Sequence, residues 1–245
     1  MIRSIVWLLA ASISLILLTP VLLVAWLIRD RDPDGEPSSI ARWIVEDLLP
    51  HYIRLGGCKY KVYGTENIPK GAALFTGNHQ GNFDTVLILS VLGGYKIPIA
   101  KKEAAKVPIV GAWMKLLRVI FMDRKDVRQS AECIKKAEEL LQRGKSVVIF
   151  PEGTRSKGPQ MNEFKPGAFK ASIRAGAPVV PFVIDGTYKC FEEDRRLKKA
   201  DVTVHILPAV DPKALGITKT KELSDLVRSL IQQQLDKNHG QSPSA

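Results

Sequence analysis

The chain has 245 residues, of which 45% are hydrophobic and 25% are charged, and its formal net charge at pH 7 is +11. These proportions exclude a disordered chain, and the length suffices for one large domain or two small ones. Residues 1–37 carry a net charge of −1, so the excess of Lys and Arg belongs to the rest of the chain. Such basicity fits nucleic acid, an anionic membrane surface or an anionic small substrate.

The first distinctive segment is 4–28, which contains no charged side chain. As a helix it would measure roughly 37 Å, more than the ~30 Å hydrocarbon core of a bilayer, and it is too long for the apolar core of a secretory signal. Pro20 could kink this helix or divide it into a re-entrant pair. More arginines follow the segment than precede it, so the positive-inside rule favours a cytoplasmic location for the rest of the protein. The segment predicts a membrane anchor.

Residues 30–39 have the composition of a turn-rich polar linker. Residues 40–55 then place apolar side chains at helical spacing, with Ser39 in position to cap the helix and Trp43 beside the apolar stripe. Such a helix can lie in the membrane interface or pack on the core of the domain, and the pattern fits both alternatives. We assign residues 1–55 to a membrane anchor with an amphipathic interfacial helix.

β-prone apolar runs alternate with helical patterns in residues 56–239. This alternation predicts a single α/β domain, with a mixed, mostly parallel sheet flanked by helices. The final residues, 240–245, are predicted to form a disordered tail. The predicted strands are 60–63, 72–76, 97–100, 119–122, 146–150, 179–184 and 202–208, and the predicted helices are 85–92, 109–117, 127–143, 168–175 and 219–234.

The three cysteines, Cys58, Cys133 and Cys190, are far apart and odd in number. We therefore expect three free thiols in a reducing compartment. No group of His, Cys and carboxylate residues has the spacing of metal ligands, so no metal site is predicted. A Gly-x-Ser-x-Gly motif is also missing from the sequence, which disfavours a serine esterase.

The sequence Asn-His-Gln-Gly-Asn-Phe-Asp at 78–84 places His79 five positions before Asp84. A predicted strand precedes the pair and a predicted helix follows it, so the two residues are expected at a strand-to-helix turn. A histidine that is held by a carboxylate can take a proton from a hydroxyl near neutral pH. Chance often produces such a spacing, so the pair needs support from other residues.

That support comes from the sequence Phe-Pro-Glu-Gly-Thr-Arg-Ser at 150–156, which follows another predicted strand. Pro151 cannot continue a central strand and Gly153 tolerates unusual dihedral angles, so the following side chains are expected at an edge of the sheet. Arg155 offers a planar guanidinium suited to phosphate. Taken alone, the segment could equally be an ordinary turn with a surface arginine.

Basic residues are concentrated between these two motifs. Residues 95–128 contain nine Lys or Arg and three acidic residues, and they form either a solvated basic face or a second source of phosphate ligands. After the second motif, Lys165 precedes a predicted helix and is expected to point toward the same region. The apolar run 178–184 contains Pro181, which predicts an edge strand or the lining of a channel for an apolar substrate.

Together and in this order, the motifs resemble those of the glycerolipid acyltransferase family, in particular the 1-acylglycerol-3-phosphate acyltransferases. The resemblance covers about residues 60–210. It rests on Asn-His-x-x-x-x-Asp at 78–84, Lys-Lys-Glu and Pro-x-x-Gly at 101–111, Asp-Arg at 123–124, Phe-Pro-Glu-Gly-Thr-Arg-Ser at 150–156 and Val-Pro-Phe-Val at 180–183.

The resemblance implies transfer of a fatty acyl chain from acyl-CoA or acyl carrier protein to the sn-2 hydroxyl of 1-acylglycerol 3-phosphate, giving phosphatidic acid. His79 would be the general base, and Asp84 would fix its tautomer and stabilise the imidazolium. An apolar groove near 180–184 would take the acyl chain. The implied substrate-binding residues are Asn78, which would orient the loop, the candidate phosphate ligands Lys101, Lys102, Arg124 and Arg155, and Glu152, Gly153, Thr154 and Lys165.

The expected partners are the membrane lipid lysophosphatidic acid, an acyl donor and an anionic membrane surface, and no cofactor is expected. Nucleic acid is not expected, because the chain lacks a basic stripe studded with aromatic residues. Three alternatives stay open: an acyltransferase acting on glycerol 3-phosphate or another lysophospholipid, a membrane-tethered lipid-binding protein without turnover, and a hydrolase that uses the His–Asp pair to activate water.

Overall fold

The computed structural model describes residues 2–28, 37 and 39–240 of the chain. Within these residues, seven strands form one sheet in the order β1-β7-β6-β2-β5-β3-β4. Neighbouring strands are parallel except for β6 and β7, which are antiparallel. The strands are β1 (Cys58–Tyr63), β2 (Leu74–Gly77), β3 (Ile97–Lys101), β4 (Ile120–Met122), β5 (Val147–Ile149), β6 (Val179–Asp185) and β7 (Ala200–Ile206).

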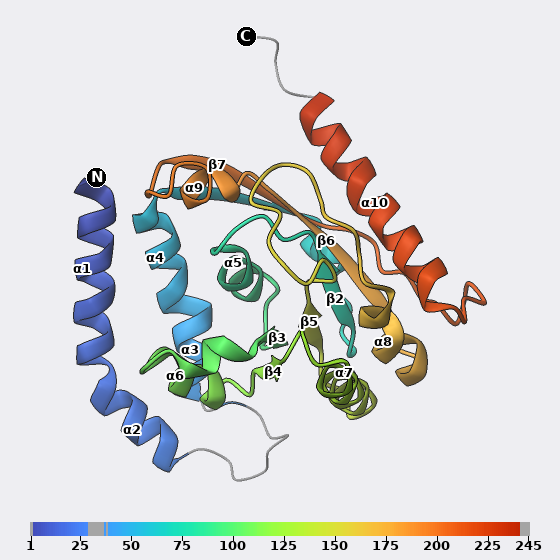
Figure 1. The fold of residues 1–245 in the computed structure, drawn as a ribbon, viewed down its shortest axis with the longest axis horizontal. Helices are drawn as coiled ribbons and strands as arrows, with labels where there is room; N and C mark the ends of the chain where they lie inside the picture. The colour runs from blue at the N-terminus through green and yellow to red at the C-terminus, as the bar shows by residue number, and fades with distance from the viewer. Residues whose placement is uncertain (1, 29–36, 38, 241–245) are drawn as a thin grey trace.

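Helices cover both faces of the sheet (Figure 1). Each layer of helices encloses its own hydrophobic cluster against the sheet. Short 3₁₀ turns occur at Thr65–Asn67, Lys102–Lys106 and Pro166–Phe169. One layer contains α4 (Leu49–Gly56), α5 (Asp84–Val91), α6 (Val110–Leu116) and α9 (Tyr188–Phe191), and the other contains α7 (Val127–Gln142), α8 (Lys170–Ala175) and α10 (Thr220–Gly240).

Local sequence explains the longer helices. At the start of α7, Asp126 caps the helix, because its side chain accepts hydrogen bonds from the backbone N–H groups of Arg128 and Gln129 at 2.9 and 3.1 Å. Besides Ser224, the buried face of α10 consists of apolar residues four positions apart, which is the spacing of one face of a helix. These residues are Leu223, Val227, Ile231 and Leu235.

The structure confirms the predicted α/β class and the mixed, mostly parallel sheet. Each predicted strand and helix of the domain is present, with shifted ends, and α10 continues to Gly240 instead of ending near residue 234. Gly240, the first residue of the predicted tail 240–245, is helical, and residues 241–245 lie outside the described residues, as does most of the predicted linker 30–39. Ser39 is the first residue of α3 (Ser39–Trp43).

The prediction that Pro181 marks an edge strand is wrong. Strand β6 lies between β7 and β2, and its first six residues are buried. The carbonyl of Pro181 faces the end of β7, where it accepts the N–H of Leu207 at 2.8 Å. In a strand, the N–H and C=O of one residue point to the same side. An N–H at position 181 would therefore point toward the end of β7. The β6–β7 pairing starts one residue later, at Phe182 and Ile206, so the missing N–H of proline interrupts no hydrogen bond of this ladder.

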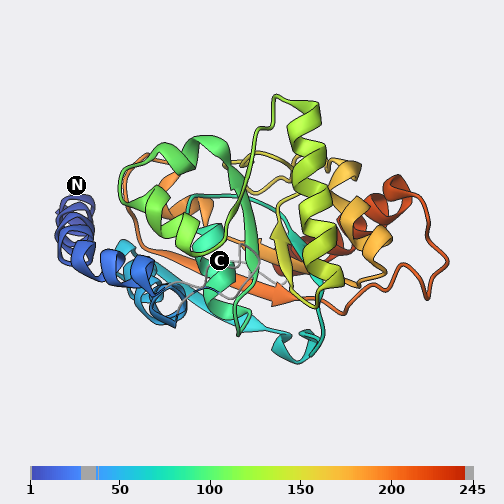
Figure 2. The ribbon, with the colours of Figure 1, turned by 90° about the horizontal axis from the view of Figure 1, so that it is seen from below.

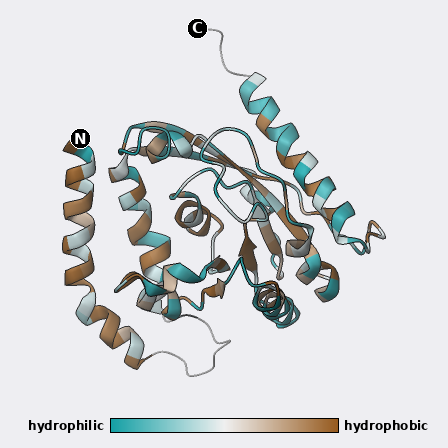
Figure 3. Cartoon of the chain, viewed as in Figure 1, coloured by the Kyte–Doolittle hydropathy of each residue, from teal (hydrophilic) through white to brown (hydrophobic). Residues whose placement is uncertain are grey.

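The apolar segment before the domain forms two helices, α1 (Ile2–Leu17) and α2 (Thr19–Leu27), and Pro20 lies in the first turn of α2. Neither they nor any other single helix among the described residues has the length and apolar character to cross a membrane. As a pair α1 and α2 do, but they are bent by 43° relative to each other. Figure 2 shows both at one side of the α/β body, and Figure 3 shows their largely apolar composition.

The helical stripe at 40–55 packs on the domain. It consists of α3, a π-helical turn at Ile44–Leu48 and α4, and Ile44, Val45 and Ile53 are buried in the core next to α5. The prediction of an interfacial helix is therefore wrong for the apolar stripe, although Trp43 beside it is about half exposed. Of the two alternatives, core packing is the one observed.

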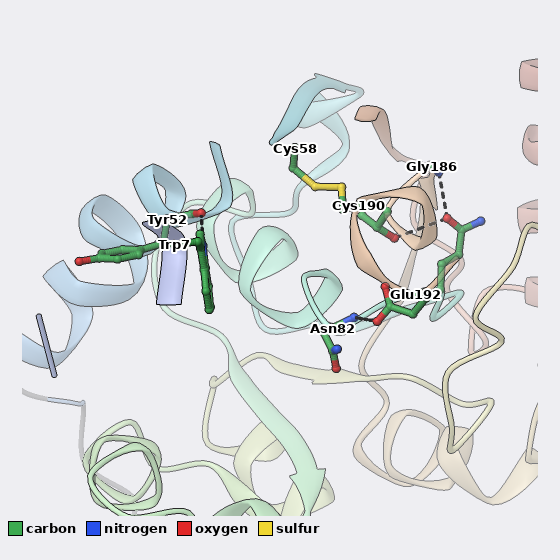
Figure 4. The surroundings of a disulfide bond; sticks show 9 residues. Trp7, Tyr52, Cys58, Asn82, Gly186, Cys190 and Glu192 are labelled. Atoms are coloured by element: carbon green, nitrogen blue, oxygen red, sulfur yellow. Dashed lines mark hydrogen bonds between the residues drawn. A yellow bond between two sulfur atoms is a disulfide. The ribbon is translucent and has the colours of Figure 1, made fainter. Parts of the chain in front are cut away.

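Two of the three cysteines form a disulfide, so the expectation of three free thiols is wrong. Cys58 begins β1 and Cys190 lies on α9, with 6.0 Å between their Cα atoms (Figure 4). Cys133 is free and buried on α7. The pairing was not visible in the sequence because 132 positions separate the two residues, and only the placement of β1 beside β7 brings them together.

Candidate active site

The predicted site residues gather at one edge of the sheet. Strands β2, β3, β4, β5 and β6 are mutually parallel, so their carboxyl ends meet there. In open α/β sheets this edge is where ligands bind. The segments that follow these strands contain His79, Lys102, Arg124, Arg155 and Glu192.

His79 and Asp84 form a hydrogen-bonded pair. The Nδ1 atom of His79 lies 2.8 Å from Oδ2 of Asp84, and this oxygen also accepts the N–H of Gly81 at 2.8 Å. Asp84 is fully buried in the first turn of α5, and the side chain of His79 is 13% exposed. Because a carboxylate only accepts hydrogen bonds, this contact selects the neutral imidazole tautomer with its proton on Nδ1 and its lone pair on Nε2. The pair is thus arranged for general base catalysis.

The imidazole ring is also fixed by packing. It stacks on the ring of Phe150, with 4.2 Å between the centroids and 24° between the planes. Phe150 in turn makes an edge-to-face contact with Phe182 of β6. These contacts limit rotation of the histidine ring, so its free nitrogen keeps one direction.

Glu152 ties the second motif to the first. Its Oε1 accepts the backbone N–H of His79 at 2.7 Å, and its Oε2 accepts the N–H of Asn162 at 2.9 Å. The N–H of Ser156 donates to the carbonyl of His79 at 2.7 Å. Burial raises the pKa of Glu152, while the two N–H donors act against that rise. Both carboxylate oxygens hold the backbone, which makes Glu152 a positioning residue.

Asn78 and Gln80 hold the same loop from the other side. The Asn78 amide donates to the carbonyl of Ile184 at 2.7 Å and accepts the N–H of Ile184 at 2.8 Å, and its side chain is buried. Gln80 Oε1 accepts the N–H of Gly186 at 2.9 Å. Asn78 and Gln80 therefore tie this loop to the end of β6 and the residue after it, and both hydrogen-bonding groups of the Asn78 amide are engaged there.

The two arginines of the site have different partners. Arg124 donates to the carbonyl of Gly153, whose φ of 70° is in the left-handed region that suits glycine. Burial lowers the pKa of Arg124 from its ordinary high value. Arg155 donates to the side chain of Asn82 and lies 3.1 Å from Glu192. Each guanidinium has five N–H donors, and these contacts leave donors for an anion.

The predicted lysines are spread over the same edge. Lys102 pairs with Asp123, which raises the pKa of Lys102 and lowers that of Asp123, and Lys101 pairs with Glu103 at 3.4 Å. Lys165 lies against Gly153. Thr154 is exposed. No three His, Cys, Asp or Glu side chains gather as a metal site in the described part of the chain.

A groove of about 580 Å³ adjoins the site on the side of α7 and α8. Phe150, which stacks on His79, forms part of its wall, and the groove has the size of a small-molecule site. Residues 180–184 do not line this groove, because all five are buried within the sheet. The prediction of an acyl-chain groove at these residues is therefore wrong. The groove has an apolar part with Ile99, Met122, Ile134, Ile149 and Ala168, and a basic part with Arg124, Arg128, Lys165, Lys170 and Arg174.

The sequence analysis missed Glu192 and Asn82. Glu192 lies outside every motif, in a run of charged residues after α9 that resembles an ordinary surface turn. Asn82 lies inside the His–Asp motif, but spacing alone gives no indication that its side chain meets Arg155. No signal in a single sequence connects these residues, because the contact depends on how β6 is placed beside β2.

Comparison with known proteins identifies the family of the chain. The acyltransferase family model matches residues 59–185. The chain is 32% identical over 201 residues to a probable 1-acyl-sn-glycerol-3-phosphate acyltransferase of Mycoplasma pneumoniae, covering 78% of this chain and 76% of that protein. It is 34% identical over 193 residues to the chloroplastic 1-acyl-sn-glycerol-3-phosphate acyltransferase BAT2 of Brassica napus, covering 76% of this chain and 54% of the relative.

A solved structure shares the whole fold. The crystal structure of the 1-acyl-sn-glycerophosphate (LPA) acyltransferase PlsC from Thermotoga maritima superposes with a TM-score of 0.78 at 25% identity, covering 96% of this chain and 95% of that one. The resemblance seen in the motifs is therefore confirmed. The chain belongs to the acyltransferase family, and it is an acyltransferase related to the 1-acyl-sn-glycerol-3-phosphate acyltransferases.

Proposed function

We propose that this enzyme transfers a fatty acyl chain from acyl-CoA or acyl carrier protein to the sn-2 hydroxyl of 1-acylglycerol 3-phosphate, giving phosphatidic acid. The observation that carries the proposal is the His79–Asp84 pair, 2.8 Å apart, beside arginines that follow β4 and β5. A base next to phosphate ligands suits an acceptor that has both a hydroxyl and a phosphate.

In the proposed reaction, Nε2 of His79 takes the proton of the sn-2 hydroxyl as its oxygen attacks the thioester carbonyl. The tetrahedral intermediate collapses, the carbon–sulfur bond breaks, and the thiolate leaves and recovers a proton from the imidazolium. Asp84 stabilises the imidazolium between these steps. All proton transfers are carried by side chains, so the proposal includes no resident cofactor.

The groove and its basic part supply the binding determinants in this proposal. Arg124 and Lys165 lie where the groove meets Gly153, and we assign them to the phosphate together with Arg155. The apolar part of the groove takes an acyl chain. Lys101 and Lys102, which are exposed and partly neutralised by Glu103 and Asp123, act at longer range through their charge.

Membrane attachment through α1 and α2 completes the proposal. Many apolar side chains of these helices are exposed, including Leu9, Ile13, Ile16 and Leu23. Exposed apolar surface of this extent favours contact with lipid. The substrate is a lipid, so a site held at the bilayer can receive it without transfer through water. The arginines after the segment favour the cytoplasmic face.

The test is an assay of the purified full-length protein in detergent with labelled acyl-CoA and labelled acyl carrier protein. The acceptors are lysophosphatidic acid, glycerol 3-phosphate and lysophosphatidylcholine. We expect phosphatidic acid from lysophosphatidic acid, with the highest kcat/KM of the three. A higher kcat/KM with another acceptor would contradict the proposed substrate, and release of free fatty acid without any acylated product would indicate a hydrolase.

A further inference from the structure

Glu192 is a buried carboxylate at the edge of the site that no motif includes. Its side chain is only 3% exposed, and it follows α9 directly. Burial raises the pKa of Glu192, against the effect of the Asn82 N–H and the charge of Arg155. Burying a carboxylate carries a free-energy cost, so a position with several partners indicates a specific role.

Its partners belong to the two catalytic motifs. Oε1 of Glu192 accepts the backbone N–H of Asn82 at 2.7 Å, and Nη1 of Arg155 lies 3.1 Å from the same oxygen (Figure 4 shows the first contact). Arg155 also donates to the side chain of Asn82. Glu192, Asn82 and Arg155 thus form a closed triangle that joins the His79 loop to the turn after β5.

Gly81 leaves room for this carboxylate. A Cβ atom at Gly81 would lie 2.7 Å from Oε2 of Glu192, so a side chain there would displace the carboxylate from its present position. Oε2 is itself buried and has no hydrogen-bond partner among the described residues. Glycine at position 81 thus allows the Glu192 carboxylate to lie against the loop between His79 and Asp84.

The segment that carries Glu192 is held from three directions. The Cys58–Cys190 disulfide ties it to β1, and Gln80 accepts the N–H of Gly186 before it. After it, the N–H of Leu197 donates to the hydroxyl of Ser4 on α1 at 2.9 Å. Glu192 lies two positions after the disulfide-bonded Cys190, so the backbone that carries its carboxylate is held in place. A positioning group requires such support.

We propose that Glu192 is a positioning residue for acyl transfer, which holds Arg155 in place for the phosphate of the acceptor and fixes the loop of His79. This inference rests on the proposed function and extends it to a residue outside the family motifs. An arginine that becomes ordered only on binding loses part of its binding energy to the entropy cost of ordering. The Glu192 carboxylate orders it beforehand, and Asn82 sets its direction.

The test compares Glu192→Ala and Glu192→Gln with the wild type and with Glu193→Ala, a neighbouring exposed glutamate that serves as a matched control. We expect Glu192→Ala to raise the KM for the acceptor roughly tenfold with a smaller change in kcat. Glu192→Gln, which keeps an acceptor for Asn82, should have an intermediate effect, and Glu193→Ala should match the wild type.

A double-mutant cycle with Arg155→Ala separates positioning from general structural damage. If Glu192 acts through Arg155, its removal changes the KM little in the Arg155→Ala background. Equal KM values for the wild type and Glu192→Ala, or a full effect that persists without Arg155, would overturn the proposal.

The role of Glu192 can be tested even if lysophosphatidic acid is not the preferred acceptor. All three acceptors carry a phosphate group, so the same KM comparison applies to whichever one the wild type acylates. Calorimetric Kd values for lysophosphatidic acid in detergent give the comparison without turnover. Weaker binding in Glu192→Ala than in Glu193→Ala supports the inference, and equal binding overturns it.

Discussion

The backbone of His79 is fixed by the turn after β5, while its ring is fixed by Asp84 and Phe150. The sequence spacing could predict that Asp84 binds the His79 ring, because a histidine with a nearby carboxylate is a known arrangement for proton transfer. It could not predict the role of Glu152, since a side chain that accepts a backbone N–H leaves no pattern of residue types. The motifs located the segments that meet at this edge of the sheet, but they revealed neither Glu192 nor the contacts that distinguish residues holding the backbone from residues left to bind substrate.

At this scale, Glu192→Gln gives a prediction about stability. The groups that face Glu192 are Arg155, the Asn82 N–H and, at longer range, Asp84. Burial raises the pKa of Glu192 by more than the Asn82 N–H and the Arg155 charge lower it. A carboxyl group with a raised pKa in the folded state contributes most to stability below its ordinary pKa of about 4.3, and this contribution is lost as the pH rises through the folded-state value.

Glutamine does not titrate, so the variant should gain in stability relative to the wild type as the pH rises from about 4 to 8. At pH 7 we expect a Tm equal to or above that of the wild type, although the acceptor KM is raised. Thermal unfolding of both proteins in detergent across this range is the measurement. A stability deficit of the variant that grows with pH would show that the ion pair with Arg155 outweighs the cost of burial.

Among the elements, those with clear periodicity could be predicted and those that depend on tertiary neighbours could not. The apolar run of β6 and the four-residue spacing on α10 indicated the right structures. The sequence could not show that β6 is central, because the missing N–H of Pro181 is harmless only where β7 ends. It likewise could not show that the stripe at 40–55 packs against α5 instead of lipid.

The disulfide between β1 and α9 leads to a prediction about stability. Cys58→Ser or Cys190→Ser should lower the free energy of unfolding by about 2–4 kcal/mol, because a long loop in the unfolded chain is no longer closed. Thermal unfolding with and without dithiothreitol should reproduce this loss in the wild type. Cys133→Ser serves as a control that leaves the disulfide intact.

Alkylation checks the pairing directly. After denaturation without reductant, iodoacetamide should modify only Cys133, and after reduction it should modify all three cysteines. Three modifications without reductant would contradict the disulfide in the purified protein. This result would also favour the reducing compartment that the cysteine count first suggested.

For the whole molecule, the parallel order of five strands brings motifs from distant parts of the sequence to one edge of the sheet. The family resemblance made this gathering predictable, but it misplaced the groove, which lies between α7 and α8 and not along β6. The location of a groove depends on which helices leave space between them. The bent α1–α2 pair lies beside the domain, and its exposed apolar side chains are in keeping with a site that receives a membrane lipid.

The measurement that tests the central claim most directly is the kcat of His79→Ala for acylation of lysophosphatidic acid by the purified full-length enzyme. His51→Ala, which changes an exposed histidine on α4, is the matched control, and unchanged Tm values confirm that both variants are folded. We predict a loss of about 10²–10⁴-fold in kcat for His79→Ala and none for His51→Ala. A kcat for His79→Ala close to that of the wild type would contradict general base catalysis by His79.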